Sequence, residues 1–464
     1  MERMEKEKAV FGSRRLDLVG GPILRTLITL AMPIMVSSFL NTVYSITDMA
    51  WIGLLGSRAV AGVGVGGMFM WLAQGFGATA RMGGQVMVGQ SIGRGVRDAA
   101  VRYARGAVHL AILLAAVYAF VLVCFTGRLV SLFGLHDAVA EASAVRYMKI
   151  TAGCVILPYL TGVLGGIYTA QGDSRTPLLA NFIGLAVNMF LDPMLILGVG
   201  PFPQLGVVGA ACATVTAQFL SVLIMALRSR RDSANVLSGL RLLRPAGKSF
   251  YRHIVHIGVP ASLQSMAYCL ISMTLTRRIA VFGAAAVAVQ NVGGNVESVS
   301  WNIADGFSSS MNAFCAQNYG AGKPDRIRRG YRIAFLAIFC WGLFITLLME
   351  LFPARIGGIF FHEADALLTA VPYFRIVGLS EALMCVEIMT TGALSGLGRT
   401  RLCSLISITL TAARIPLAAA LSGTALGLSG VWTALAVTSI AKGVTFALAF
   451  RHVSGRLLAE RTGR

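Results

Sequence analysis

Two aspartates lie inside apolar stretches of the chain, where a carboxyl group is costly to bury. Asp48 ends a row of polar residues at helical spacing, which are Ser37, Asn41, Tyr44 and Asp48. Asp192 ends a second such row, after Asn181 and Asn188. Pro193 follows it directly and, because it has no backbone N–H, permits a bend beside the carboxyl group. Ionisable groups at membrane depth usually mark a site or a pathway.

Two carboxyl groups with amides nearby suit the binding of a proton or a sodium ion, since carboxylate and amide oxygens are hard ligands. We therefore expect cation or proton coupling at Asp48, Asn181, Asn188 and Asp192, with a possible sodium site at Asp48, Asn188 and Asp192. No other metal site is expected. The structural alternative is that both aspartates only hydrogen-bond to amides on neighbouring helices.

A third polar row predicts a cavity lining. It contains Asn291, Asn295, Ser298, Asn302 and Asp305, with Glu297 beside it. Together with Asn41 and Tyr44, these residues are the candidate substrate cavity, although polar packing between helices would give a similar pattern. Glu381, Glu387 and Arg414 are further buried-charge candidates, and an acid–arginine pair among them could be structural or functional.

The composition places these residues in a membrane protein. The 464 residues are 56% hydrophobic and 13% charged, with a mean hydropathy of +0.72. Long apolar stretches each cover the ~20 residues that span a bilayer as a helix. We predict about twelve, at 26–54, 59–86, 103–126, 147–170, 178–199, 206–228, 254–282, 286–314, 331–353, 371–395, 402–423 and 426–450.

The chain is duplicated. Pro33, Gly66 and Gln90 recur as Pro260, Gly293 and Gln317, an offset of 227 (260 − 33) that is too long for solenoid repeats. This predicts an N-terminal tail (1–25), an N-lobe (26–228), a basic joint (229–252), a C-lobe (253–452) and a C-terminal tail (453–464). The two aspartates have no acidic counterparts in the second half, so we expect asymmetric coupling chemistry.

The net charge of +20 follows membrane topology. Arginine and lysine gather in the tails, the joint and alternate loops, which predicts an inner-membrane protein with both termini cytoplasmic and no nucleic-acid partner. No cleavable signal peptide is expected. The sequence has no nucleotide-binding loop and no recognisable enzyme motif, so we expect no enzyme activity and no cofactor, with transport energy from an ion gradient.

The chain resembles the multidrug and toxic compound extrusion (MATE) transporters, nearest the DNA-damage-inducible-protein-F-like branch. The resemblance extends from about residue 20 to 452 and is carried by LAMPIMVSSFLNTVYSITDMAWIGLLG, QGDSRTPLLANFIGLAVNMFLDPMLILG and LSGLGRTR. It implies an all-α polytopic protein with two homologous six-helix lobes around a central cavity. Asp48, Asn188 and Asp192 match the family's N-lobe cation or proton site.

The resemblance implies a secondary active antiporter that exports small amphipathic, cationic compounds in exchange for protons or sodium by rocking of the two lobes. Two departures stand out. The fourth span offers only Tyr159 and Thr161 where a family member has an asparagine, and Gln264 is the long polar residue where another branch has a glutamate. A lipid-linked saccharide flippase is the alternative. We expect a monomer in the lipid bilayer.

Overall fold

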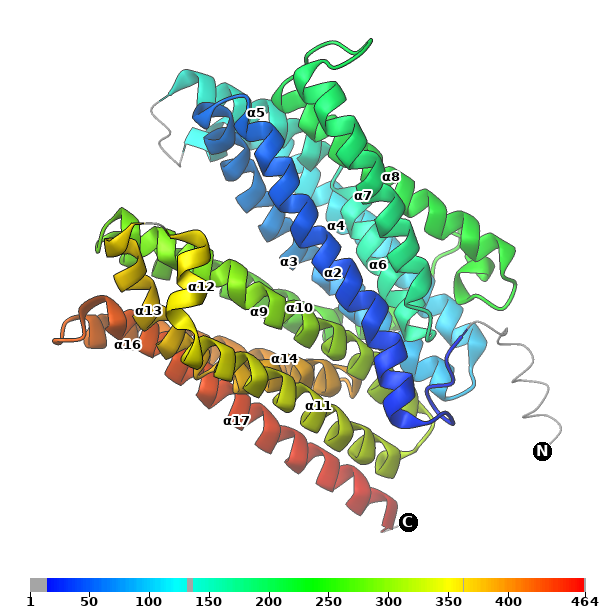
Figure 1. The fold of residues 1–464 in the computed structure, drawn as a ribbon. Coiled ribbons are helices and arrows are strands. Elements are labelled where there is room, and N and C mark those ends of the chain that lie inside the picture. The colour runs from blue at the N-terminus through cyan, green and yellow to red at the C-terminus, as the bar shows by residue number, and fades with distance from the viewer. Residues whose placement is uncertain (1–14, 132–136, 362, 463–464) are drawn as a thin grey trace. The chain divides into compact units, whose positions relative to one another are not determined.

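The computed structural model describes residues 15–131, 137–361 and 363–462, which contain helices and no β-strand. The outer parts of both predicted tails, 1–14 and 463–464, lie outside the described residues. The helices, most of them labelled in Figure 1, are α2 (Ile23–Gly53), α3 (Ser57–Gly93), α4 (Arg97–Ser131), α5 (Ala138–Gly153), α6 (Ile156–Ala170), α7 (Arg175–Leu197), α8 (Val207–Arg231), η1 (Val236–Gly239), α9 (Lys248–Ala280), α10 (Ala284–Gly320), α11 (Pro324–Leu351), α12 (Pro353–Phe360), α13 (Ala364–Gly378), α14 (Glu381–Gly396), α15 (Thr400–Ala412), α16 (Arg414–Ser422) and α17 (Gly427–Thr462).

The helices fall where the hydropathy predicts membrane spans. Within the described ranges, nine helical stretches are long and apolar enough to cross a membrane, and two bent pairs raise that number to eleven. The pairs are α5 with α6, bent by 45°, and α13 with α14, bent by 50°. The remaining predicted span, 286–314, coincides with α10, which carries the third polar row. The all-α polytopic fold is confirmed.

The helices form two compact units, which are described separately. Unit 1 contains the chain up to Asp17 and Val36–Ser262, and unit 2 contains Leu18–Met35 and the chain from Leu263 onward. The predicted lobes follow the sequence without interruption. By contrast, the first part of α2 belongs to unit 2, and the first part of α9 belongs to unit 1.

Unit 1 packs around α3, which contacts α4, α5 and α6, while α7 packs against α8. Ala100, Ala104, Ala107 and Ala111 fall on one face of α4 and are fully buried. Small side chains let helix backbones approach closely, and close packing is what holds helices together in a membrane. The spacing of alanines thus fixes which face of α4 turns inward.

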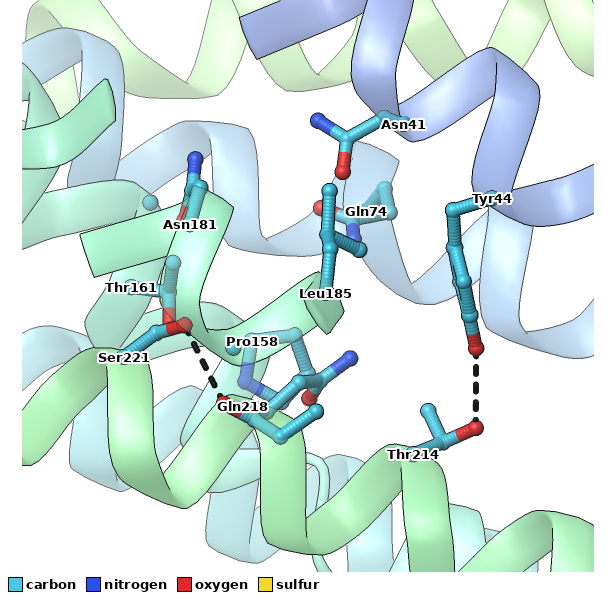
Figure 2. Close-up of a pocket in the computed structure, with 13 residues that line it drawn as sticks. Asn41, Tyr44, Gln74, Pro158, Thr161, Asn181, Leu185, Thr214, Gln218 and Ser221 are labelled. Atoms are coloured by element: carbon cyan, nitrogen blue, oxygen red, sulfur yellow. Dashed lines mark hydrogen bonds between the residues drawn. The ribbon is translucent and has the colours of Figure 1, made fainter. Parts of the chain in front are cut away.

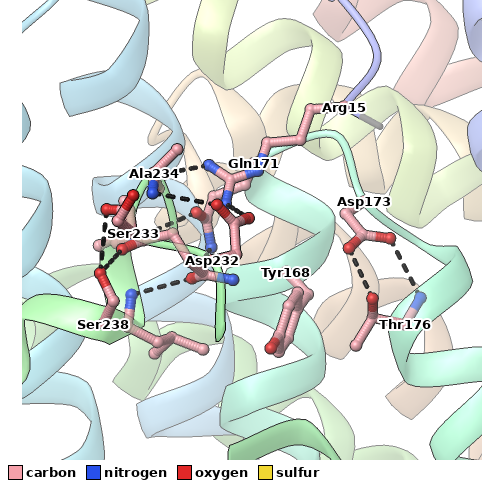
Figure 3. A network of polar contacts seen from close by, with 12 residues as sticks. Arg15, Tyr168, Gln171, Asp173, Thr176, Asp232, Ser233, Ala234 and Ser238 are labelled. Atoms are coloured by element: carbon pink, nitrogen blue, oxygen red, sulfur yellow. Dashed lines mark hydrogen bonds and ion pairs between the residues drawn. The ribbon is translucent and has the colours of Figure 1, made fainter. Parts of the chain in front are cut away.

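The predicted joint is ordered against unit 1 (Figure 3). Arg15 pairs with Asp232 at 2.5 Å and donates to the carbonyl of Ala234. The Gln171 side chain donates to Asn235 at 3.1 Å and accepts from the backbone N–H of Val236 at 2.9 Å. These polar contacts therefore hold the first part of the joint, through η1, against Arg15 and against Gln171 at the end of α6.

Unit 2 packs around α14, which contacts α10, α11 and α17, and α16 packs along α17. Leu27 and Ala31, from the first part of α2, are buried in the same core as Phe314. The hydroxyl of Ser310 donates to the carbonyl of Leu27 at 3.1 Å, and the Asn318 amide donates to that of Leu18 at 3.0 Å. The segment Leu18–Met35 is thus an integral part of unit 2.

The duplication is visible as a repeated contact. Gly66 of α3 faces the ring of Tyr147, and a Cβ at that glycine would lie 2.7 Å from ring carbon Cδ1. In unit 2, Gly293 of α10 lies against Tyr373 in the same way and even more closely. Any larger residue would displace the tyrosine ring, so each unit uses a glycine to seat one buried tyrosine.

Candidate functional site

The polar row of α2 faces the interior of unit 1. The Tyr44 hydroxyl lies 3.1 Å from the Thr214 hydroxyl of α8, and the Asn181 amide of α7 donates to Ser37 at 3.0 Å. One turn beyond Tyr44, Asp48 has a buried carboxylate oxygen with no hydrogen-bond partner among the described residues. Two members of the row, Ser37 and Tyr44, thus lie on the face that meets α7 and α8, whereas Asn41 is exposed.

Asp192 is fully buried on α7. The Asn188 amide, one turn earlier, donates to its Oδ1 at 3.3 Å. The other carboxylate oxygen and the Asn188 carbonyl oxygen have no hydrogen-bond partner among the described residues. Buried polar atoms are nearly always paired, so these two acceptors are available to a proton, a cation or a water molecule.

Both acids belong to unit 1, Asp48 on the second part of α2 and Asp192 on α7. The two helices meet where the Asn181 amide of α7 donates to Ser37 of α2. A site shared by the two carboxyl groups stays a prediction. Within the described ranges, no group of three or more His, Cys, Asp or Glu side chains could hold a metal ion. Two carboxyl groups with an amide oxygen suit a proton or a singly charged cation better than a transition metal.

A cavity of about 280 Å³ lies in unit 1 and is lined in part by Tyr44, which is one turn from Asp48 on α2 (Figure 2). Three predicted residues, Asn41, Tyr44 and Asn181, line it. Asn181 thus lies at the cavity, although it was assigned to ion coupling. The sequence analysis missed the other polar lining residues, which are Gln74, Thr161, Thr214, Gln218 and Ser221.

The lining is polar but uncharged. It combines amides and hydroxyls with Pro158, Leu185 and small residues, and Asp48 and Asp192 are outside it. Gln218 is the single amide of its span, and this isolation was the available signal for it, whereas the span of Gln74 also contains Gln85. Such a wall can donate and accept hydrogen bonds but supplies no countercharge of its own.

The third polar row lies on α10 of unit 2. Asn291 and Asn295 are exposed, and Ser298, Asn302 and Asp305 are partly exposed. Glu297 lies off the row and accepts a hydrogen bond from Tyr373 of α13. The Tyr373 hydroxyl also accepts a hydrogen bond from Gln290 at 3.5 Å, and Gln290 accepts one from the Trp432 ring nitrogen at 3.1 Å. Glu297 thus helps connect α10 to α13, Gln290 connects α10 to α17, and Glu297 does not extend the row.

The expected acid–arginine pair does not form among the described residues. Glu387 of α14 pairs instead with Lys442 of α17, at 2.8 Å, with both side chains at most 10% exposed. Arg414 is buried and donates to the hydroxyls of Thr438 and Ser439, at 2.9 and 2.7 Å. The sequence analysis missed Lys442, a single lysine in the apolar stretch TSIAKGVTF. Unit 2 thus contains buried charged residues at positions that do not correspond to Asp48 and Asp192 in the internal repeat.

Comparison with known proteins decides the family. The MatE family model matches residues 33–194 and 260–420, once in each half, and each match begins at one of the duplicated prolines. The chain belongs to the MatE family. It is therefore a multi-pass membrane transporter and not an enzyme.

MatE relatives and structures match nearly the whole chain. A probable multidrug resistance protein NorM of Thermotoga maritima is 27% identical over 413 residues, 88% of each chain. A FAD transporter of Shewanella oneidensis is 26% identical over 439 residues, 93% of this chain and 95% of its own. A solved structure of a multidrug resistance MATE family transporter in an outward-facing conformation has a TM-score of 0.89 at 21% identity, covering 96% of this chain and 99% of that one. The structural likeness shows the fold.

Proposed function

We propose that this MatE protein is a secondary active antiporter that exports small amphipathic, cationic compounds in exchange for protons or sodium ions. The observation that carries the proposal is the acid pair Asp48 and Asp192, whose unpaired oxygens adjoin a polar cavity of the same unit. The exchanged ion binds at the acids, with Asn188 as a further oxygen ligand, and the exported compound binds in the cavity.

Tyr44 connects ion binding at the acids with binding of the exported compound in the cavity. Its hydroxyl lies 3.1 Å from the Thr214 hydroxyl in the cavity wall, and Asp48 is one turn farther along the same helix. An ion at the acids removes the negative charge that favours a cationic ligand in the cavity, so the ion and the exported compound bind in alternation. Coupling of this kind requires only that each ligand lowers the affinity for the other. The two-state element would be the rocking of the two lobes.

The names of relatives support export of small molecules, since they include multidrug resistance proteins and a FAD transporter. A flavin dinucleotide carries phosphates, and the unit 1 cavity has no basic side chain to bind them. The same reasoning disfavours the flippase alternative, which needs basic groups for a lipid-linked phosphate. We place the protein in the inner membrane with both termini cytoplasmic, as the distribution of arginine and lysine indicates.

The test is transport by the purified protein in vesicles with an imposed proton or sodium gradient and a fluorescent cationic dye. With one proton exchanged per dye cation, a gradient of one pH unit supplies about 1.4 kcal/mol, or about tenfold accumulation. Asp192→Asn should abolish gradient-driven accumulation and leave equilibrium dye binding measurable, because the cavity lining is intact. Asp98→Asn, at an exposed acid in the first turn of α4, is the matched control.

The two gradients separate the ions, since only the coupled ion should drive uptake. Accumulation by Asp192→Asn at the wild-type level under either gradient would refute the assignment of the acid pair. A cavity variant such as Gln218→Leu should instead weaken dye binding and keep ion coupling for whatever dye is carried.

A further inference from the structure

A second cavity lies in unit 2, at the end of α9, and serves no part of the proposed transport site. It has a volume of about 390 Å³ and is formed by the last turns of α9, the residues that follow them and α16. Its lining is mostly apolar and is completed by two arginines; it consists of Thr274, Leu275, Arg277, Arg278, Val281, Phe282, Ile415 and Ser422. The volume falls in the range of small-molecule sites, ~300–1,000 Å³.

The two arginines carry charge that the described residues do not neutralise. Both are exposed, and neither is in an ion pair with a described carboxylate. Arg278 has only a long hydrogen bond, 3.5 Å, to the hydroxyl of Ser422. Two guanidinium groups that line the same groove and have no ion-pair partner among the described residues therefore present a site for an anion, and the planar fork of arginine matches a phosphate.

The position of the groove along α9 specifies the kind of anion. The helix has 33 residues, so it is about 50 Å long and exceeds the ~30 Å hydrocarbon core of a bilayer. Basic residues stand in its first and last turns, which puts the end with Arg277 and Arg278 at the level of the lipid headgroups. Leu275 forms the buried floor of the groove, and Val281 and Phe282 are exposed at its edge.

We propose that this groove binds an anionic membrane lipid, with Arg277 and Arg278 on the phosphate and the apolar lining against the glycerol and the start of an acyl chain. The occupant is a lipid and not free phosphate, because most of the lining is apolar and would gain nothing from an inorganic ion. The site is independent of the transport cavity in unit 1, so its failure would leave the proposed function untouched.

The experiment is a lipid titration of the purified full-length protein in detergent, with bound lipid counted by native mass spectrometry. The probes are phosphatidylglycerol, which is anionic, and phosphatidylethanolamine, which is zwitterionic. Wild type should bind one phosphatidylglycerol at least about fivefold more tightly than phosphatidylethanolamine, and that preference should disappear in Arg277→Gln/Arg278→Gln, since each interfacial arginine accounts for about fivefold. Arg277→Lys/Arg278→Lys should recover most of it.

Two further variants serve as a control and as an independent test of the groove. Arg230→Gln/Arg231→Gln removes another exposed arginine pair, at the end of α8, and should leave the lipid preference unchanged. Thr274→Phe fills the groove with both arginines in place, so it should weaken lipid binding even if the double arginine variant does not fold. Equal binding of the two lipids by wild type, equal loss in both arginine pairs, or full competition by millimolar inorganic phosphate would overturn the proposal.

Discussion

The buried pair of Glu387 and Lys442 gives the sharpest test of what stabilises unit 2. The two charges are 2.8 Å apart between α14 and α17, and their side chains are at most 10% exposed. Removing one partner leaves an uncompensated buried charge, which costs about 3–5 kcal/mol. Replacing both with apolar residues removes the desolvation penalty together with the attraction, so that cost should largely vanish.

We therefore expect Glu387→Met and Lys442→Met each to destabilise the protein by about 3–5 kcal/mol, and the double variant to be more stable than either. Glu387→Met should be the more severe single change. It leaves Lys442 beside Arg414, which already acts on it with like charge. The assay is equilibrium unfolding in mixed detergent and lipid micelles, followed by the fluorescence of the five tryptophans.

The stability of the double variant, compared with the two single variants, tests whether Glu387 and Lys442 stabilise one another. If the two single costs simply add, the residues do not stabilise one another and the pair is incidental to the fold. Thr433→Val, on an earlier turn of α17, is a suitable control because its hydroxyl bonds only within its own helix, to the Ser429 carbonyl. It should change the unfolding free energy by less than either charge removal.

Two other changes have expected outcomes. Gly293→Ala should cost about 1–3 kcal/mol in the same unfolding assay, because the new Cβ overlaps the ring of Tyr373. Tyr373→Leu also removes the hydroxyl that donates to Glu297, so the loss in the double variant should be smaller than the sum of the two single losses. Backbone N–H groups of Ala140 and Val139 donate to Asp137 and hold the pKa of that carboxyl below its usual value of 3.8. The ionised carboxylate therefore stabilises the fold above pH 3.8, and this stabilisation is lost as the pH falls through the lowered pKa. Asp137→Ala should thus lower the melting temperature at pH 7, with the difference from wild type shrinking at the acid end; a constant difference across pH would contradict this.

The positions of the spans could be predicted from sequence because hydropathy alone sets them in a bilayer. The breaks within two spans were not predicted. Pro158 cannot donate to the carbonyl of Cys154, where α5 has ended, so it was an available signal for the first break, whereas no proline lies at the second, after Gly378. A bend at such a point depends on how the following segment packs, and that packing involves residues distant in the chain.

The burial of Asp192 could be predicted because a carboxylate in an apolar stretch is conspicuous. The cavity of unit 1 was only half predictable. Asn41 and Tyr44 lie on a regular row, but Gln74 and Gln218 follow no such row and line one cavity only when α3 and α8 are folded. The partner of Glu387 was missed for the same reason, since nothing near Lys442 in the sequence points to α14.

The exchange of segments between the two units has a consequence for how the protein is made. The Leu27 carbonyl accepts a hydrogen bond from Ser310, 283 positions later, so this contact can form only after Ser310 has been synthesised. Unit 1, in turn, is incomplete until the first part of α9 has left the ribosome. A gene divided at the joint would therefore encode two polypeptides, each lacking a piece of its own core and carrying one that belongs to the other. Although the two halves share an internal repeat, neither half is therefore expected to fold alone.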